Sequence, residues 1–296
     1  MDMMYLRIMK SAFLLSLMMC FHNILFSQIN DTVITFTPVE ITAEKLLKEK
    51  VLDKIVLDST VLQNYFNHSL SEVLSNNSCV FVKTYGQGSL ATVSMRGTAA
   101  SHTQVEWNGM NINSPMLGQV DFSQIPIWFL DQVEVLSGSS SLQSGSGAIG
   151  GNVNITNIPG FNRKLYGSFV QSVGSFESYQ SFVQIGGGNS KLQGKLRAYY
   201  DVSENNFEYY NNANGLWNYE KQLNAGYEKK GFLSEVFYNH KNNSMALAFW
   251  FHKSKRDLPP IMSYQGLGRK EQQFDEDIRL SFNWKHFFKR GFSDLS

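Results

Sequence analysis

The sequence predicts a mixed α+β domain at residues 45–160, followed at residues 161–296 by antiparallel strands of a transmembrane β-barrel. Short strand patterns separated by glycine turns, with one capped helix, indicate the first domain. Segments of about ten residues in which apolar and polar side chains alternate indicate the second. The composition fits both, because aromatic residues make up 14% of the chain and 23 glycines stand against 6 prolines. A formal charge of +1 provides no basic surface for a nucleic-acid partner.

The N-terminal residues have the pattern of a secretory signal peptide. Arg7 and Lys10 precede the uncharged run "SAFLLSLMMCFHNILF", which the polar stretch "SQINDT" follows. The run is shorter than the roughly 20 residues of a membrane-spanning helix, so an uncleaved anchor is the weaker alternative. We predict a signal peptide at residues 1–27, a flexible leader at residues 28–44 and an exported mature protein. Its remaining cysteine, Cys79, stands among apolar residues and is predicted to be buried.

Several short elements are predicted within residues 45–160. Ser69 and Glu72 have the spacing of a capping box, which predicts a short helix after Ser69. The stretch "CVFVKTYGQGSLATVSMRG" predicts two strands joined by a glycine turn. Asn108-Gly109, between the strand-like stretches 104–107 and 110–112, predicts a tight β-hairpin. Two further strands are predicted in "DQVEVLSG" and "GNVNITNI".

A complete G-x-G-x-x-G pattern at Gly145, Gly147 and Gly150 raises the alternative of a nucleotide-dependent exported enzyme. A phosphate-binding loop of this kind needs a helix that opens after the glycines. The residues that follow, 152–156, alternate and favour a strand instead. We therefore predict that the glycines form a tight corner and pack closely on a neighbouring surface. No Ser/His/Asp or Cys/His set is evident, so no catalysis is predicted.

Beyond residue 161 the alternation becomes regular. In "KLQGKLRAYYDV" one face carries Leu192, Leu196 and Tyr200, and the other carries Lys195 and Arg197. The segment "DIRLSFNWK" repeats the pattern. A soluble β-sandwich also alternates, but full charges on the polar faces of an exported chain favour a barrel with a watery interior. In lipid, a one-residue slip would expose the charges at about 2–4 kcal/mol each near the midplane, so the register is predicted to be firm.

The combined motifs resemble the plug domain of TonB-dependent outer-membrane receptors. The resemblance rests on an Arg-Gly pair, an Asn-Gly hairpin turn, a Val-Glu-Val strand and a glycine-rich stretch that leads into the first barrel strand. These are Arg96-Gly97, Asn108-Gly109, Val133-Glu134-Val135 and Gly147-Ala148-Ile149-Gly150-Gly151. Ser137, Gly138 and Ser139 depart from the family, which commonly has a basic residue and then Gly-Pro there. The resemblance implies a plug inside a barrel in the outer membrane of a Gram-negative cell.

The resemblance also implies partners and site residues. Val39, Glu40, Ile41, Thr42 and Ala43 resemble the TonB box, which would bind TonB by strand addition, and Asp31–Thr35 is the competing candidate. Arg96 is predicted to pair with carboxylates between plug and barrel wall, and a solvated arginine at a turn is the alternative. Glu134 is predicted either to be a partner of this kind within the plug or to lie on the exposed face of its strand. Tyr85, Met116 and Leu117 are the predicted ligand contacts, and ordinary turns without a ligand are the alternative for their loops. No metal or cofactor is predicted.

The function that the resemblance implies is import, with energy from TonB, of a small scarce ligand: a metal chelate, siderophore or cobalamin. The alternative is a truncated or non-transporting plug protein that binds a ligand without import. About six strands are expected after residue 160, which are too few to close a barrel in lipid. We therefore expect the chain to be the N-terminal part of a longer receptor.

Overall fold

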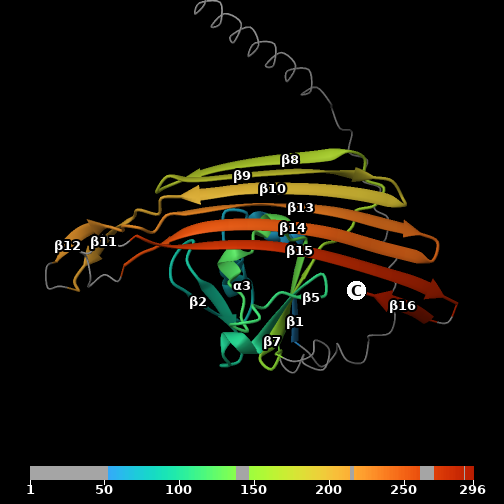
Figure 1. Cartoon of the computed structure of the whole chain (residues 1–296), viewed down its shortest axis with the longest axis horizontal. Helices are drawn as coiled ribbons and strands as arrows, with labels where there is room; N and C mark the ends of the chain where they lie inside the picture. Colours follow the sequence, from blue (N-terminus) through green and yellow to red (C-terminus); the bar gives the residue numbers. More distant parts are fainter. Residues whose placement is uncertain (1–52, 138–146, 214–216, 261–269, 290) are drawn as a thin grey trace, which may run out of the picture. The chain divides into compact units, whose positions relative to one another are not determined.

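The computed structural model describes residues 53–137, 147–213, 217–260, 270–289 and 291–296. The predicted signal peptide, the leader and both candidate TonB boxes lie outside the described residues. The described chain forms two parts, an N-terminal α/β domain and a sheet of long strands that we call the wall sheet. Figure 1 shows the α/β domain lying against one face of the wall sheet.

The α/β domain is built on a five-stranded sheet in the order β1-β6-β7-β4-β5. Only the pair β4–β7 is parallel, and the other neighbours are antiparallel. Its strands are β1 (Asp53–Leu57), β4 (Thr103–Trp107), β5 (Met110–Asn111), β6 (Gln132–Ser137) and β7 (Gly151–Thr156), and a separate hairpin joins β2 (Phe81–Thr84) to β3 (Ala91–Ser94). The helices are α2 (Ser59–Asn64), α3 (Leu70–Asn77) and the 3-10 turns η2 (Ala100–His102), η3 (Phe122–Gln124) and η4 (Ile127–Phe129).

Local sequence signals explain these elements. The Ser69 hydroxyl accepts a hydrogen bond from the Glu72 amide at 3.3 Å, which confirms the predicted start of α3. Asn108 and Gly109 have φ values of +49° and +85°, which confirms the tight turn between β4 and β5. The elements β1 and α2 are not among those predicted above. Cys79 is exposed rather than buried, because the chain leaves α3 there and turns the side chain outward.

The close packing predicted for the glycine-rich corner before β7 is confirmed at Gly150 and is found also at Gly151. Gly147 has no atom within 4 Å of a Cβ built on it, and Gly145 lies outside the described residues. A Cβ atom on Gly151 would lie 2.6 Å from the Leu136 carbonyl oxygen, and one on Gly150 would lie 3.2 Å from that of His102. No side chain fits at such distances without a shift of the backbone. The strand β7, rather than a helix, follows these glycines, so the nucleotide-binding alternative has no helix terminus on which to place a phosphate.

The wall sheet has seven antiparallel strands in the order β16-β15-β14-β13-β10-β9-β8. They are β8 (Tyr166–Gly174), β9 (Ser178–Gly188), β10 (Leu192–Ser203), β13 (Tyr227–His240), β14 (Asn243–Leu258), β15 (Glu271–Phe288) and β16 (Gly291–Leu295). A small hairpin of β11 (Glu208–Asn211) and β12 (Asn218–Lys221) lies in the connection from β10 to β13. We call the end of the wall sheet with this long connection the loop end, and the opposite end, where residues 241–242 join β13 to β14, the turn end.

The two faces of the wall sheet are the reverse of those in a soluble protein. The side chains that point away from the α/β domain are apolar and exposed, as for Ile278 (65%) and Leu280 (61%). Those that point toward it include buried polar and charged groups such as Lys195 and Arg197. Both predicted strand faces are therefore confirmed. An exposed apolar face of this extent is stable only against another apolar phase, and lipid meets that requirement. Within the described residues no helix is long and apolar enough to cross a membrane.

The exposed face provides a test of lipid contact. Leu280 lies mid-strand in β15 and Leu192 is the first residue of β10. We expect Leu280→Arg to lower the free energy of unfolding in detergent or lipid by about 2–4 kcal/mol, and Leu192→Arg by about 0–1 kcal/mol, because the cost of a charge falls toward the membrane interface. Urea titration of the protein refolded in liposomes measures both. Equal effects of the two substitutions would contradict a lipid-facing sheet.

Candidate functional site

The contacts between the α/β domain and the wall sheet are concentrated in one segment, residues 121–131, which we call the docking segment. It contains η3 and η4 and ends at Asp131, just before β6. Its side chains and carbonyls bond to four wall strands, β10, β13, β14 and β15. Most of these bonds join polar groups that are buried once the two parts meet.

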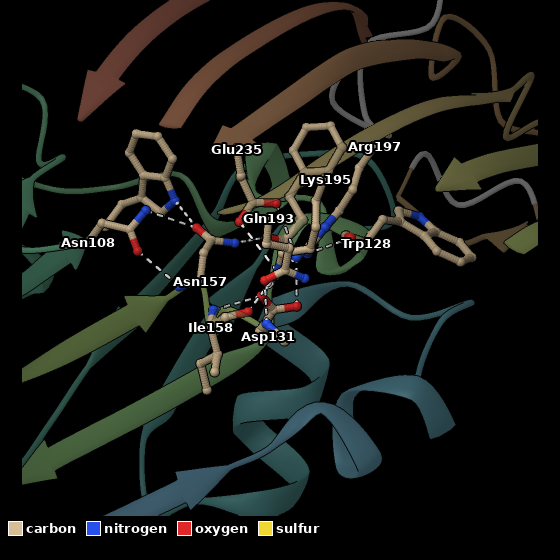
Figure 2. Close-up of polar contacts among 12 residues, drawn as sticks. Asn108, Trp128, Asp131, Asn157, Ile158, Gln193, Lys195, Arg197 and Glu235 are labelled. Atoms are coloured by element: carbon tan, nitrogen blue, oxygen red, sulfur yellow. Dashed lines mark hydrogen bonds and ion pairs between the residues drawn. The ribbon is translucent and has the colours of Figure 1, made fainter. Parts of the chain in front are cut away.

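The strongest of these contacts is a cluster of four charges around Asp131 (Figure 2). Arg197 donates to both Asp131 oxygens, at 2.7 Å and 2.8 Å, and Lys195 donates to Oδ2 at 2.7 Å. Glu235 on β13 lies 3.2 Å from the Arg197 guanidinium and 3.6 Å from the Lys195 ammonium. Two cations thus face two carboxylates, and the cluster is neutral only when the α/β domain supplies Asp131.

Backbone groups extend the cluster on both sides of Asp131. The Ile158 amide donates to Asp131 Oδ2 at 2.8 Å, and Lys195 also donates to the Ile158 carbonyl at 2.8 Å. The same Arg197 donates to the Trp128 carbonyl at 3.4 Å. The two wall cations are therefore bonded to the plug at a residue before Asp131 and at another well after it in the chain. Removing one partner of such a buried pair usually costs about 3–5 kcal/mol, because the other charge is left unpaired.

The environment of Asp131 fixes its ionised form. Burial acts to raise the pKa of the Asp131 carboxyl, but the adjacent charges of Arg197 and Lys195, with their hydrogen bonds, outweigh burial together. The pKa of Asp131 therefore lies below its ordinary value. The carboxylate remains charged, and the contact intact, across the neutral range.

A second charged contact lies nearer the loop end. Asp121 pairs with Arg256 on β14 at 2.8 Å. The other oxygen of Asp121 accepts hydrogen bonds from the amides of Ala91 and Ser123, both at 3.0 Å, and so caps η3 and holds β3. Lys229 on β13 donates to the Ser123 carbonyl at 2.7 Å. The start of the docking segment is thus fixed by two wall cations.

Between the two charged contacts lies a neutral chain of hydrogen bonds. His252 on β14 is fully buried, with Nε2 at 2.8 Å from Gln124 Oε1 and Nδ1 at 2.6 Å from the Tyr199 hydroxyl. Gln124 Nε2 donates to Asp275 at 3.5 Å, which assigns the amide orientation. With that orientation His252 donates through Nε2–H, and a neutral imidazole would accept the Tyr199 proton at Nδ1.

Asn157 joins the hairpin turn to the docking segment (Figure 2). Its Oδ1 accepts from Trp107 Nε1 at 2.8 Å and from the Asn108 amide group at 3.0 Å, and its own side-chain amide donates to the Phe129 carbonyl at 2.7 Å. Asn283 on β15 donates to the Asn108 carbonyl at 3.3 Å. The predicted Asn108-Gly109 turn is therefore part of the contact with the wall sheet.

The structure places Arg96, the arginine predicted to pair across the contact, in a turn of the α/β domain. Arg96 and Gly97 form an exposed turn after β3, with φ values of +51° and +72°. The ion pairs described above instead use acids of the α/β domain and cations of the wall sheet, which is the opposite polarity to the one expected. Glu134 is half-buried and pairs with Lys54 of β1 at 2.9 Å, within the α/β domain. Whether Arg96 pairs with carboxylates of the wall stays a prediction.

The three predicted ligand contacts are exposed apolar side chains on loops. Tyr85 is in the β2–β3 loop, whose Gln87 and Gly88 contact Tyr227 at the loop end. Met116 and Leu117 are in the loop that returns to Asp121 and its partner Arg256. The structure therefore leaves all three accessible, and their contact with a ligand stays a prediction. The described residues contain no group of three His, Cys, Asp or Glu that would hold a metal ion.

Sequence reasoning missed the docking acids Asp121 and Asp131. Their partners lie far along the chain, 64 positions away for the pair of Asp131 with Lys195. One signal was available: two cations on the inward face of a buried strand need carboxylates opposite them. Lys195 and Arg197 were correctly placed on that face, but nothing local identified which acids would meet them.

Comparison with known proteins identifies the α/β domain. Residues 49–152 match the family model of the TonB-dependent Receptor Plug Domain. The chain carries the plug of a TonB-dependent receptor. The plug is followed by antiparallel strands that form part of a barrel, as in the solved receptors. The corner glycines Gly150 and Gly151 both fall within the matched residues.

The relatives are transport receptors. The chain is 38% identical over 119 residues to the vitamin B12 transporter BtuB of Photobacterium profundum, which covers 40% of this chain and 19% of BtuB. The siderophore receptor PirA of Acinetobacter baumannii has a TM-score of 0.60 at 19% identity, over 81% of this chain and 38% of PirA. Pyoverdine-bound FpvA of Pseudomonas aeruginosa has a TM-score of 0.62 at 14% identity, over 82% and 36%. The match to this chain thus spans about a fifth of BtuB. The structures of PirA and FpvA share the fold of this chain.

The charged cluster predicts how firmly the plug is docked. We expect Asp131→Asn to lower the free energy of unfolding of the plug by about 3–5 kcal/mol, because Lys195 and Arg197 would then face only Glu235. The control is Asp294→Asn, which breaks the exposed pair with Lys285 and should cost about 0–1 kcal/mol. Tryptophan fluorescence during urea unfolding measures both. A loss below 1 kcal/mol for Asp131→Asn would contradict the assigned role.

The same pair predicts a pH dependence. The pKa of Asp131 is below its ordinary value of 3.8, so its stabilisation is fully present above that value and lost as the pH falls through the lower folded pKa. We expect the stability difference between wild type and Asp131→Asn to be constant from about pH 7 to pH 4 and to shrink below about pH 4. A difference that shrinks between about pH 7 and pH 5 would show that another group controls the contact.

Proposed function

We propose that the chain is part of an outer-membrane receptor that binds a small scarce ligand and imports it with energy from TonB. The observation that carries the proposal is a plug held by buried polar pairs against the inner face of a sheet whose outer face is apolar. Such pairs can exchange their partners for water when the plug moves, which a fully apolar contact would resist. The plug therefore both closes the passage and is able to leave it.

The ligand belongs to the siderophore or cobalamin class. Cobalamin comes first, because the chain is 38% identical over 119 residues to a vitamin B12 transporter, whereas the siderophore receptors share the fold at 14–19% identity. Tyr85, Met116 and Leu117 are the proposed contacts on the plug. Exposed apolar side chains on loops suit a large ligand that is partly apolar, and each gains binding energy when it is covered.

The energy enters through the leader. Val39–Ala43 is the proposed TonB box and Asp31–Thr35 the alternative. A strand added to an edge of TonB uses main-chain hydrogen bonds and depends little on side chains, so proline is the residue that should abolish it. Outer-membrane location and export through the signal peptide complete the proposal. Several structural neighbours are outer-membrane receptors by description, the alcaligin receptor FauA of Bordetella pertussis among them.

Binding and uptake of vitamin B12 by cells that express the receptor at its natural length test the proposal. We expect Ile41→Pro to abolish uptake and to leave binding unchanged, whereas Val33→Pro should leave both unchanged. The reverse pattern would make Asp31–Thr35 the box. Ferric siderophores are tested in the same way if vitamin B12 does not bind. Binding without uptake in the wild type would support the non-transporting alternative, and no binding of either class would overturn the assignment.

A further inference from the structure

Two separate cavities lie between the plug and the wall sheet. The first, of about 290 Å³, is at the loop end and is lined by Gln87 of the plug and by Gln180, Asp201 and Lys229 of the wall. The second, of about 260 Å³, is at the turn end and is lined by Asp131, Lys195, Arg197 and Gln193. The wall residues that line the two cavities are mostly polar. The cavities lie one after the other along strands β9 and β10, from the loop end toward the turn end.

The cavities meet at a stack of three aromatic rings. Phe66 and Trp128 of the plug line both cavities. Their rings stack with a centroid distance of 4.5 Å, and Trp128 stacks on Phe182 of β9 at 4.8 Å. We call Phe66, Trp128 and Phe182 the aromatic stack. Figure 2 shows the Trp128 indole directed away from the charged cluster, although its carbonyl bonds to Arg197.

The register of the wall sheet places the boundary at one level. Phe182 is directly opposite Tyr199 in the pairing of β9 with β10. Inward residues on the loop-end side of this pair, Gln180 and Asp201, line the first cavity, and those on the other side, Gln184 and Arg197, line the second. An apolar layer about one residue thick therefore divides a polar path. Narrow apolar layers of this kind block water and ions because a hydrated solute cannot enter them.

Unsatisfied polar atoms indicate that the first cavity is suited to polar contents. In the described residues, Gln180 Oε1 and Asp201 Oδ1 are buried and have no hydrogen-bond partner within the protein. Both belong to residues that line this cavity. Buried oxygens of this kind need donors, which water or a small hydrophilic solute supplies. The wall side of this cavity therefore offers acceptors to water or a small hydrophilic solute, and the cavity reaches as far as the aromatic stack.

We propose that the aromatic stack is a gate in a hydrophilic path between plug and wall, closed at rest to water-soluble ions and small solutes. The gate consists of side-chain packing alone, with Phe182 fixed on a wall strand and Phe66 on the connection between α2 and α3. A displacement of the plug that separates Phe66 and Trp128 from Phe182 would join the two cavities. This inference rests on the proposed function, because it assigns the stack a role in controlled passage.

Ion conductance of planar bilayers that contain the receptor at its natural length tests the gate, in potassium chloride without TonB and without ligand. We expect Phe182→Ala and Phe66→Ala each to give a steady conductance that the wild type lacks. Phe182→Tyr should stay closed, because it keeps the ring. The control is Phe237→Ala, which truncates another buried wall phenylalanine that lines neither cavity. Resistance of each variant to protease verifies folding.

Each outcome decides the proposal. Conductance in both stack variants, with Phe182→Tyr and Phe237→Ala closed, supports the gate. Folded stack variants that remain closed would overturn it, and so would conductance of equal size in Phe237→Ala, which would indicate general loosening of the plug. Failure of vitamin B12 or siderophore uptake by the wild type bears on the proposed function alone, because the conductance is measured with neither ligand nor TonB.

Discussion

The period of two in a β-strand is the constraint on which the rest of the structure depends. Because alternate side chains point to opposite faces, a wall strand with Leu192, Leu196 and Tyr200 on one face must carry Gln193, Lys195 and Arg197 on the other. Lipid satisfies the first face but not the second. Two cations that lie within two residues of each other cannot be buried without carboxylates, and Glu235 supplies only one. The plug therefore contributes to the stability of the wall sheet, because Asp131 completes its charge balance. The wall sheet in turn holds the C-terminal half of the plug in place.

The contact between plug and wall sheet is strong at the docking segment and does not involve β1. Charged pairs hold the docking segment at Asp121 and Asp131, and the neutral His252 chain lies between them. The strand β1 touches the wall through none of these bonds; it pairs with β6 and through Lys54 with Glu134. A pull on the leader, which precedes β1 in the chain, would thus act first on an edge strand of five residues rather than on the buried charges. Edge strands have hydrogen bonds along one side only, so they detach at lower cost than interior strands.

Local and periodic features could be predicted from the sequence, whereas long-range pairing could not. The Asn108-Gly109 turn, the capped start of α3 and both faces of β10 follow from residues that are neighbours in the chain, and the structure confirms them. The docking acids were missed because Asp131 resembles any polar residue before a strand until Lys195 and Arg197 are folded against it. Cys79 was wrongly predicted to be buried because apolar residues follow it in the sequence, which does not show that its own side chain points outward. The strand β1 was missed because it follows a stretch rich in charged residues. The motif drew attention to Arg96, but motifs record a family's common residues and not which partner each one has in this chain.

The size of the cavities limits what the resting structure can pass. Ligands of drug size occupy sites of about 300–1,000 Å³, and the two cavities, of about 290 Å³ and 260 Å³, are smaller and separated by the aromatic stack. Under the proposed function, a cobalamin or ferric siderophore would not fit through either cavity while the plug is docked, and under the proposed gate the rings would stop water-sized solutes. The proposed passage of the larger ligand would require the plug to move. The polar contacts would make that motion reversible, because Lys195, Arg197 and Arg256 would gain water as they lose Asp131 and Asp121. The aromatic stack has no such compensation when it opens, since rings exposed to water lose their packing and gain little in return. It therefore favours the closed state even after the charged contacts have been hydrated, and it is the contact that should re-form first when the plug returns.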